Sequence, residues 1–184
     1  VVMFGGNGSQ GLLNDTWEWD GAAWSRRTTA HSPSPRTMHQ LAWDEGRQRI
    51  VLVGGASAEQ ETWEYDGVDW ALRASSRPDG QPTALTWDGV RQTLMMLVVT
   101  GGTNAVWDWS GTEWTQSAAP MPSPSRSGSR ASWDPDRRKV VLFGSLTDAS
   151  TWQWDGAAWV ETPRPTAPPG LGATLVTVDG GVFA

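Results

Sequence analysis

Apolar and polar positions alternate over short segments of the chain, and no long segment has the spacing of an amphipathic helix. The continuous apolar run Ile50–Val53 is typical of a strand that is buried on both faces. Alternation over Thr62–Asp66 places Trp63 and Tyr65 on one face of a second strand. The Asp-Gly pair that ends at Gly67 then predicts a hairpin turn. We therefore expect an all-β protein built from short antiparallel strands.

The aromatic residues recur with a fixed period along the whole chain. Each copy has three aromatic residues, spaced by two and then five positions, with a glycine between the last two. The first aromatics of successive copies lie 46, 44 and 45 residues apart. A repeat of this length that contains several short strands is typical of a β-propeller blade. The four triplets are Trp17/Trp19/Trp24, Trp63/Tyr65/Trp70, Trp107/Trp109/Trp114 and Trp152/Trp154/Trp159.

Each copy predicts four strands, which we name A to D in chain order. In the second copy, strand A ends at Trp43, strand B is the apolar run, strand C carries the alternating aromatics and strand D begins at Trp70. Proline-rich and serine-rich segments link strand D to the next strand A, because proline disfavours both helix and central strand. We expect one domain, 1–184, with repeats at 1–49, 50–93, 94–139 and 140–184.

These marks resemble the kelch repeat. That family carries a glycine pair after an apolar strand and then a spaced Tyr/Trp pair, which Gly54-Gly55, Tyr65 and Trp70 match. Many kelch units also have Arg-x-x-His before strand A, as Arg36 and His39 do here. The resemblance implies a β-propeller of kelch-like four-stranded antiparallel blades. It implies little about function, since kelch propellers serve as adaptors, actin binders and enzyme domains.

Kelch propellers usually have six or seven blades, so two interpretations of the four repeats stay open. The chain is either a fragment of a six- or seven-bladed propeller or a closed four-bladed ring. When Asp179 is aligned with Asp44, the chain ends close to the repeat position at which Val1 begins. In a closed ring, the last segment would supply strand A to the first blade and remove its open edge.

Composition narrows the possible partners and cofactors. The chain has 184 residues, with 14 Lys and Arg against 20 Asp and Glu, so its net charge of −6 argues against a general nucleic-acid binder. There are two histidines and no cysteine, which predicts no metal site, no disulfide and no cofactor. The longest apolar run, Leu94–Val99, is too short to insert into a membrane. An extracellular or cell-surface location is favoured over a cytoplasmic one.

The 14 tryptophans need a physical explanation. One interpretation is packing, because a buried tryptophan removes a large apolar area from water. The other is a sugar-stacking surface or an aromatic cage. Packing is favoured, because the tryptophans recur in every repeat whereas a binding site is usually built once.

The polar residues between the paired aromatics of strand C also recur. They point to the face of strand C opposite the aromatics, and they are either solvated or accept hydrogen bonds from an arginine such as Arg36 or Arg126. These residues are Glu18, Glu64, Asp108 and Gln153.

Binding is expected at the B–C and D–A loops, which open on one end of a propeller. The B–C segments differ in length between repeats, and specificity usually resides in such variable loops. The D–A linkers are rich in arginine, whose guanidinium suits a carboxylate or phosphate on a partner. The candidate ligand-binding residues are Arg26, Arg27, Arg36, His39, Arg73, Arg77, Arg126 and Arg130.

The functional interpretation is a non-catalytic binding module that presents these loops to a protein segment or a glycan. No catalytic residue is assigned within the chain. One alternative is part of a propeller enzyme, a glycan-acting hydrolase or oxidase, whose catalytic residues lie outside this sequence. Another is a structural spacer in a larger surface protein.

Overall fold

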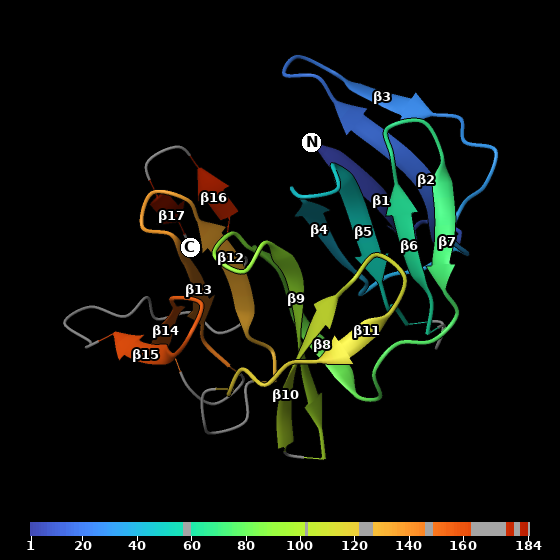
Figure 1. The fold of residues 1–184 in the computed structure, drawn as a ribbon. Helices are drawn as coiled ribbons and strands as arrows, with labels where there is room; N and C mark the ends of the chain where they lie inside the picture. Colours follow the sequence, from blue (N-terminus) through green and yellow to red (C-terminus); the bar gives the residue numbers. More distant parts are fainter. Residues whose placement is uncertain are drawn as a thin grey trace. The chain divides into compact units, whose positions relative to one another are not determined.

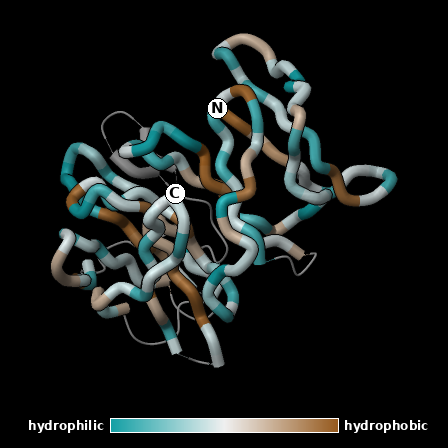
Figure 2. The backbone as a smooth tube through the Cα atoms, turned by 45° about the vertical axis from the view of Figure 1, so that its right-hand side comes forward, coloured by the Kyte–Doolittle hydropathy of each residue, from teal (hydrophilic) through white to brown (hydrophobic). Residues whose placement is uncertain are grey.

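The computed structural model describes residues 1–56, 60–101, 103–121, 127–145, 149–162, 176–178 and 181–183. Every helix or strand assigned in these ranges is a β-strand, which confirms the all-β prediction (Figure 1). Hydrophobic segments, brown in Figure 2, are short and alternate with hydrophilic ones. The chain divides into two compact units. The first comprises Val1–Trp43 and Arg47–Arg77, and the second comprises Asp44–Gly46 and Pro78–Ala184.

The first unit contains a three-stranded and a four-stranded antiparallel sheet. In each sheet the strands follow one another in chain order. The first sheet consists of β1 (Val2–Gly8), β2 (Gly11–Trp19) and β3 (Trp24–Arg27), and the second of β4 (Gln40–Asp44), β5 (Arg49–Val53), β6 (Thr62–Tyr65) and β7 (Trp70–Ala74).

The second unit contains two four-stranded sheets and a two-stranded one. The first consists of β8 (Gln81–Asp88), β9 (Thr93–Thr100), β10 (Thr103–Trp109) and β11 (Trp114–Gln116). The second consists of β12 (Arg130–Asp134), β13 (Lys139–Phe143), β14 (Thr151–Trp154) and β15 (Trp159–Thr162). The short pair is β16 (Val176–Val178) with β17 (Gly181–Phe183). The four repeats thus give four antiparallel sheets of the expected strand order.

Strand burial follows the sequence pattern. Val51, Leu52 and Val53 of β5 are fully buried, as expected for a strand that is covered on both faces. The second aromatic of strand C, Tyr65 in β6 and Trp154 in β14, is buried as well. Burial of these aromatics supports packing as the main role of the repeated tryptophans.

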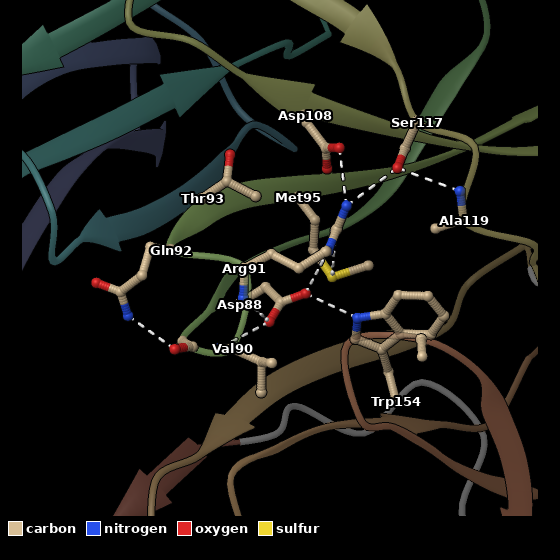
Figure 3. A network of polar contacts seen from close by, with 12 residues as sticks. Asp88, Val90, Arg91, Gln92, Thr93, Met95, Asp108, Ser117, Ala119 and Trp154 are labelled. Carbon is tan, nitrogen blue, oxygen red and sulfur yellow. Dashed lines mark hydrogen bonds and ion pairs between the residues drawn. The ribbon is translucent and has the colours of Figure 1, made fainter.

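Hydrogen bonds from buried indoles join neighbouring sheets within each unit. In the first unit, Trp70 Nε1 donates to Thr16 Oγ1 at 2.8 Å, and the ring of Trp70 packs edge-on against Phe4. In the second unit, Trp154 Nε1 donates to Asp88 Oδ2 at 2.7 Å (Figure 3). Each tryptophan therefore buries apolar area and also has a polar partner on the adjacent sheet.

The first sheet differs from the prediction in two ways. The expected B–C loop after Gly6 is largely strand, since the β1–β2 pairing continues to Gly8 and Gly11. The glycine pair does not end β1 but forms a bulge between Phe4 and Gly6. In the closed-ring interpretation the last segment would supply strand A to this sheet; in the described part of the chain β1 pairs with β2, and β16 pairs with β17.

Candidate functional site

A polar depression of about 370 Å³ lies in the first unit, at β2, the end of β3 and the linker that follows β3. We call it the polar groove. In terms of the repeat, the groove is formed by strand C, the end of strand D and the D–A linker of the first blade. Its lining residues are Asn14, Asp15, Thr16, Arg26, Arg27, Thr28, Thr29 and Ser32.

The register of β2 and β3 brings the groove residues together. Trp17 pairs with Arg26 and Thr16 pairs with Arg27, so the two consecutive arginines extend from opposite faces of β3. The linker is fastened to β2, because Ser32 Oγ donates to the Asn14 carbonyl at 3.0 Å. The linker with Thr28, Thr29 and Ser32 thereby lies against β2, which carries Asn14 and Asp15.

Arg27 is committed to contacts within the protein. Its Nε donates to Glu18 Oε2 at 2.7 Å, and the two side chains form an ion pair. Tyr65 donates its hydroxyl proton to Glu18 Oε1 at 2.8 Å. Burial opposes ionisation of Glu18, but the bonds from Tyr65 and Arg27 outweigh it and lower the pKa of that carboxyl. Burial, together with the bond to Glu18, raises the pKa of Tyr65.

Arg26 is the arginine of the groove that stays available to a ligand. It is exposed in β3, and its guanidinium has no hydrogen bond or ion pair to the residues that the structure describes. Asp15 also lines the groove. It is half-buried, and its Oδ2 accepts a hydrogen bond from Trp17 Nε1 at 2.6 Å. The groove therefore offers one guanidinium, one carboxylate and several hydroxyl and amide groups.

Arg36 was expected to face a ligand, but it is fully buried. Its Nε donates to the Ser34 carbonyl at 3.0 Å, and its NH1 donates to the Gly54 carbonyl at 3.1 Å. Its NH2 forms an ion pair with Glu61 at 2.9 Å. These bonds tie the D–A linker to the end of β5 and to the residue before β6, so Arg36 stabilises the loops rather than presenting a charge to solvent.

His39 is also placed in a packing position. It is half-buried, and its ring meets Phe4 edge-on with the centroids 5.6 Å apart. Its buried Nδ1 has no hydrogen-bond partner among the described residues. Burial, and then the nearby charge of Arg36, lower the pKa of His39.

The remaining candidate arginines do not converge on one site. Arg73 pairs with Glu64 at 2.9 Å, and Arg130 donates to the Ser129 carbonyl at 2.9 Å. Arg77 is half-buried in the first unit. Arg126 lies outside the described residues. Of the eight candidates, the polar groove brings together only Arg26 and Arg27.

Three of the recurrent polar residues of strand C pair with arginine side chains, but not with the arginines that were expected. Glu18 and Glu64 pair with the arginine nine positions later, on strand D of the same sheet. Asp108 pairs with Arg91 at 2.8 Å. Arg36, which was expected to be a donor to these residues, binds Glu61 instead.

Arg91 is a structural centre in the second unit that the sequence analysis did not identify (Figure 3). Its Nε donates to Asp88 Oδ2 at 2.7 Å, and it lies over the ring of Trp154 at 5.4 Å from the centroid. Burial disfavours its charge, but the bonds to Asp88 and Asp108 outweigh burial and raise the pKa of Arg91. The repeated spacing of Asp88 with Arg91 and Asp134 with Arg137 was the available signal.

A second depression, of about 430 Å³, lies in the first unit and is mainly apolar. Trp43, one of its lining residues, is 47% exposed. The depression lies at the start of β1 and along β4, where no strand A pairs with β1 among the described residues. The lining residues are Val1, Val2, Leu41, Ala42, Trp43 and Ile50.

Comparison with known proteins supports the fold. No protein-family profile and no curated protein sequence matches the chain. Among solved structures 66 chains match, and one of them is the structure of YjhT, a bacterial kelch-repeat β-propeller protein. That match has a TM-score of 0.64 at 12% sequence identity, and it covers 95% of this chain and 70% of that chain. The fold is therefore all-β, with antiparallel sheets that resemble the blades of a kelch propeller.

Among the described residues, no helix has the length and apolar character needed to cross a membrane.

Proposed function

We propose that this chain is a non-catalytic kelch-type binding module that recognises a protein segment or a glycan through its B–C and D–A loops. The observation that carries the proposal is the polar groove, which β2, the end of β3 and the first D–A linker form together. Loops on a regular scaffold commonly carry binding, since their sequences vary without disturbing the sheets.

The chemistry of the groove suits a polar ligand. Thr28, Thr29 and Ser32 provide hydroxyls that both donate and accept, and Asn14 adds an amide. Arg26 adds a planar guanidinium with several fixed donors and no protein partner among the described residues. A pocket with few, convergent polar groups gives orientation and specificity to a bound molecule.

The experiment compares Arg26→Gln with a matched variant, Arg138→Gln, on glycan arrays and peptide arrays. Arg138 is an exposed arginine of the second unit, outside the polar groove. We expect the unmodified chain to bind at least one ligand class and Arg26→Gln to weaken that binding by about tenfold or more, since a charged hydrogen bond is lost. Arg138→Gln should bind like the unmodified chain.

Equal loss in both variants would show that general charge, and not the groove, attracts the ligand. Absence of binding to every glycan and peptide would contradict the proposed function and favour a structural role.

A further inference from the structure

The backbone of the first D–A linker is strained at Met38. Its φ is 59°, in the left-handed region that residues with a Cβ rarely adopt. Three other described residues that are not glycine have a positive φ, and all three are hydrophilic residues in the turn between strands A and B: Gln48, Gln92 and Arg138. Met38 differs from them in being apolar and in lying on a linker, and strain of this kind is a pointer to a functional position.

Contacts on both sides of Met38 hold the linker in this conformation. Arg36 is fully buried, and its backbone makes two hydrogen bonds to the first sheet, one as donor and one as acceptor. The Thr37 carbonyl accepts from Ala56 N at 2.8 Å. On the other side, the half-buried ring of His39 packs edge-on against an aromatic ring of β1. The side chain between these anchored residues is left in solvent, and Met38 is 82% exposed.

The other four of the five methionines are less accessible, and the structure describes all of them. Met95 and Met96 of β9 are fully buried, and Arg91 NH2 donates to Met95 Sδ at 3.9 Å (Figure 3). Met121 is half-buried, and Met3 is 45% exposed. The linker thus carries the thioether that meets solvent most freely.

We infer that Met38 is a site of reversible oxidation by hydroperoxides. A lone pair of the thioether sulfur attacks one oxygen of the hydroperoxide, the O–O bond breaks, and the sulfur keeps that oxygen as a sulfoxide. The sulfur loses two electrons, and the departing hydroxide or alkoxide takes the proton of the transferred hydroxyl and leaves as water or an alcohol. A methionine sulfoxide reductase restores the thioether with two electrons from thiols. The inference is independent of the proposed function, since the reaction requires access to the sulfur and no bound ligand.

Oxidation of Met38 is expected to leave the fold intact. A sulfoxide is polar, and in solvent its oxygen remains hydrated. Oxidation of Met95 would instead place a polar oxygen in the packed core, so it requires that the second unit first opens. The exposed and the buried methionines should therefore respond differently to peroxide and to denaturant.

The test treats the whole folded chain with hydrogen peroxide and follows the sulfoxide at each methionine by peptide mass spectrometry. We expect Met38 to be oxidised about tenfold faster, or more, than Met95 and Met96, because the buried residues react only after opening. It should also react faster than Met3. In urea that unfolds the chain, the five rates should become similar, since all side chains are then accessible to the peroxide.

Met38→Leu and Met3→Leu are the matched variants, since each removes one thioether and keeps an apolar side chain of similar size. Met38→Leu should lose the first oxygen addition, and Met3→Leu should keep it. Reductases for both sulfoxide epimers, supplied with dithiothreitol, should return the oxidised chain to its original mass. The urea midpoint of the chain oxidised at Met38 should equal that of the untreated chain.

Oxidation of Met38 as slow as that of the buried methionines would overturn the inference, as would faster oxidation of Met3. A lower urea midpoint after oxidation of Met38 alone would contradict it too, because the side chain would then support the packing of the linker. A mass that the reductases do not restore would show that the modification is not reversible. These measurements use no ligand, so their outcome leaves the proposed function to its own test.

Discussion

The arginines of the linkers differ in what surrounds their guanidinium groups. Arg36 meets two carbonyl oxygens and the carboxylate of Glu61, and it is fully buried. Arg26 lies ten residues earlier in the chain, in a strand with exposed positions throughout, and stays in solvent. Burial of an arginine is tolerated only when its donors are satisfied, so local acceptors decide whether a linker arginine supports the fold or faces a ligand.

His39 gives a residue-scale prediction about pH. Burial lowers its pKa below the ordinary value of 6.5, so the unfolded chain takes up a proton at a higher pH than the folded chain. The stability that neutral His39 provides is therefore complete above the unfolded pKa and is lost as the pH falls below it. We expect the free energy of unfolding to decrease between about pH 7.5 and about pH 5.5.

The measurement is urea unfolding of the unmodified chain and of His39→Phe across that interval. His39→Phe carries no titratable group at this position and should show a smaller decrease. The carboxyls of Glu18 and Asp134 have lowered pKa values, so they stay ionised and do not contribute there. Parallel pH curves for the two proteins would show that burial of His39 has no energetic consequence.

At the scale of the elements, the bulge in β1 determines how the first sheet meets its linker. Gly5 has a φ of 56°, and a Cβ there would lie 2.7 Å from the Leu13 carbonyl oxygen and 2.9 Å from that of Arg36. The backbone approaches closely because Gly6 N donates to the Arg36 carbonyl and Arg36 N donates to the Leu13 carbonyl. The bulge at Gly5 and Gly6 therefore joins the β1–β2 hairpin to the linker that holds Arg36.

We predict that Gly5→Ala destabilises the chain more than Gly6→Ala does. Gly6 also has a positive φ, 105°, but a Cβ there meets nothing within 4 Å. Both variants carry backbone strain of about 1–3 kcal/mol, and only Gly5→Ala adds a clash with two carbonyl oxygens. Urea unfolding midpoints measure the difference, and equal midpoints would mean that the bulge relaxes freely around an added methyl group.

Sequence periodicity identified the strands because it reports burial directly. The alternating segment expected over Thr62–Asp66 is β6, Thr62–Tyr65, and the apolar run expected over Ile50–Val53 forms most of β5. The bulge at Gly5 was missed, since a glycine pair is equally compatible with a strand end.

The candidate site was predicted less well than the strands. Linkers have no periodicity, so their sequence does not tell which way Arg36 or Arg26 points. Asp15, which lines the polar groove, was missed because one acid near a strand is an ordinary feature of a sequence. Comparison of equivalent positions across the repeats would have raised it as a candidate.

At the scale of the whole molecule, the two units each have a hydrophobic core of their own. Phe4, Leu52, Tyr65 and Trp70 form the buried cluster of the first unit. A separate cluster in the second unit includes Leu142 and Trp154. In repeat proteins, stability is approximately a sum of terms within repeats and between neighbours, so damage to one core should act mainly on the unit that contains it.

Leu52→Ala and Leu142→Ala test this expectation, since both leucines are fully buried in different units. Each substitution removes buried methyl groups and leaves a cavity, at a cost of about 2–5 kcal/mol. Hydrogen exchange measured by mass spectrometry should show faster exchange in the strands of the altered unit, and the other unit should keep its protection. Loss of protection throughout the chain in either variant would contradict this expectation and would mean that the whole chain unfolds in one cooperative step.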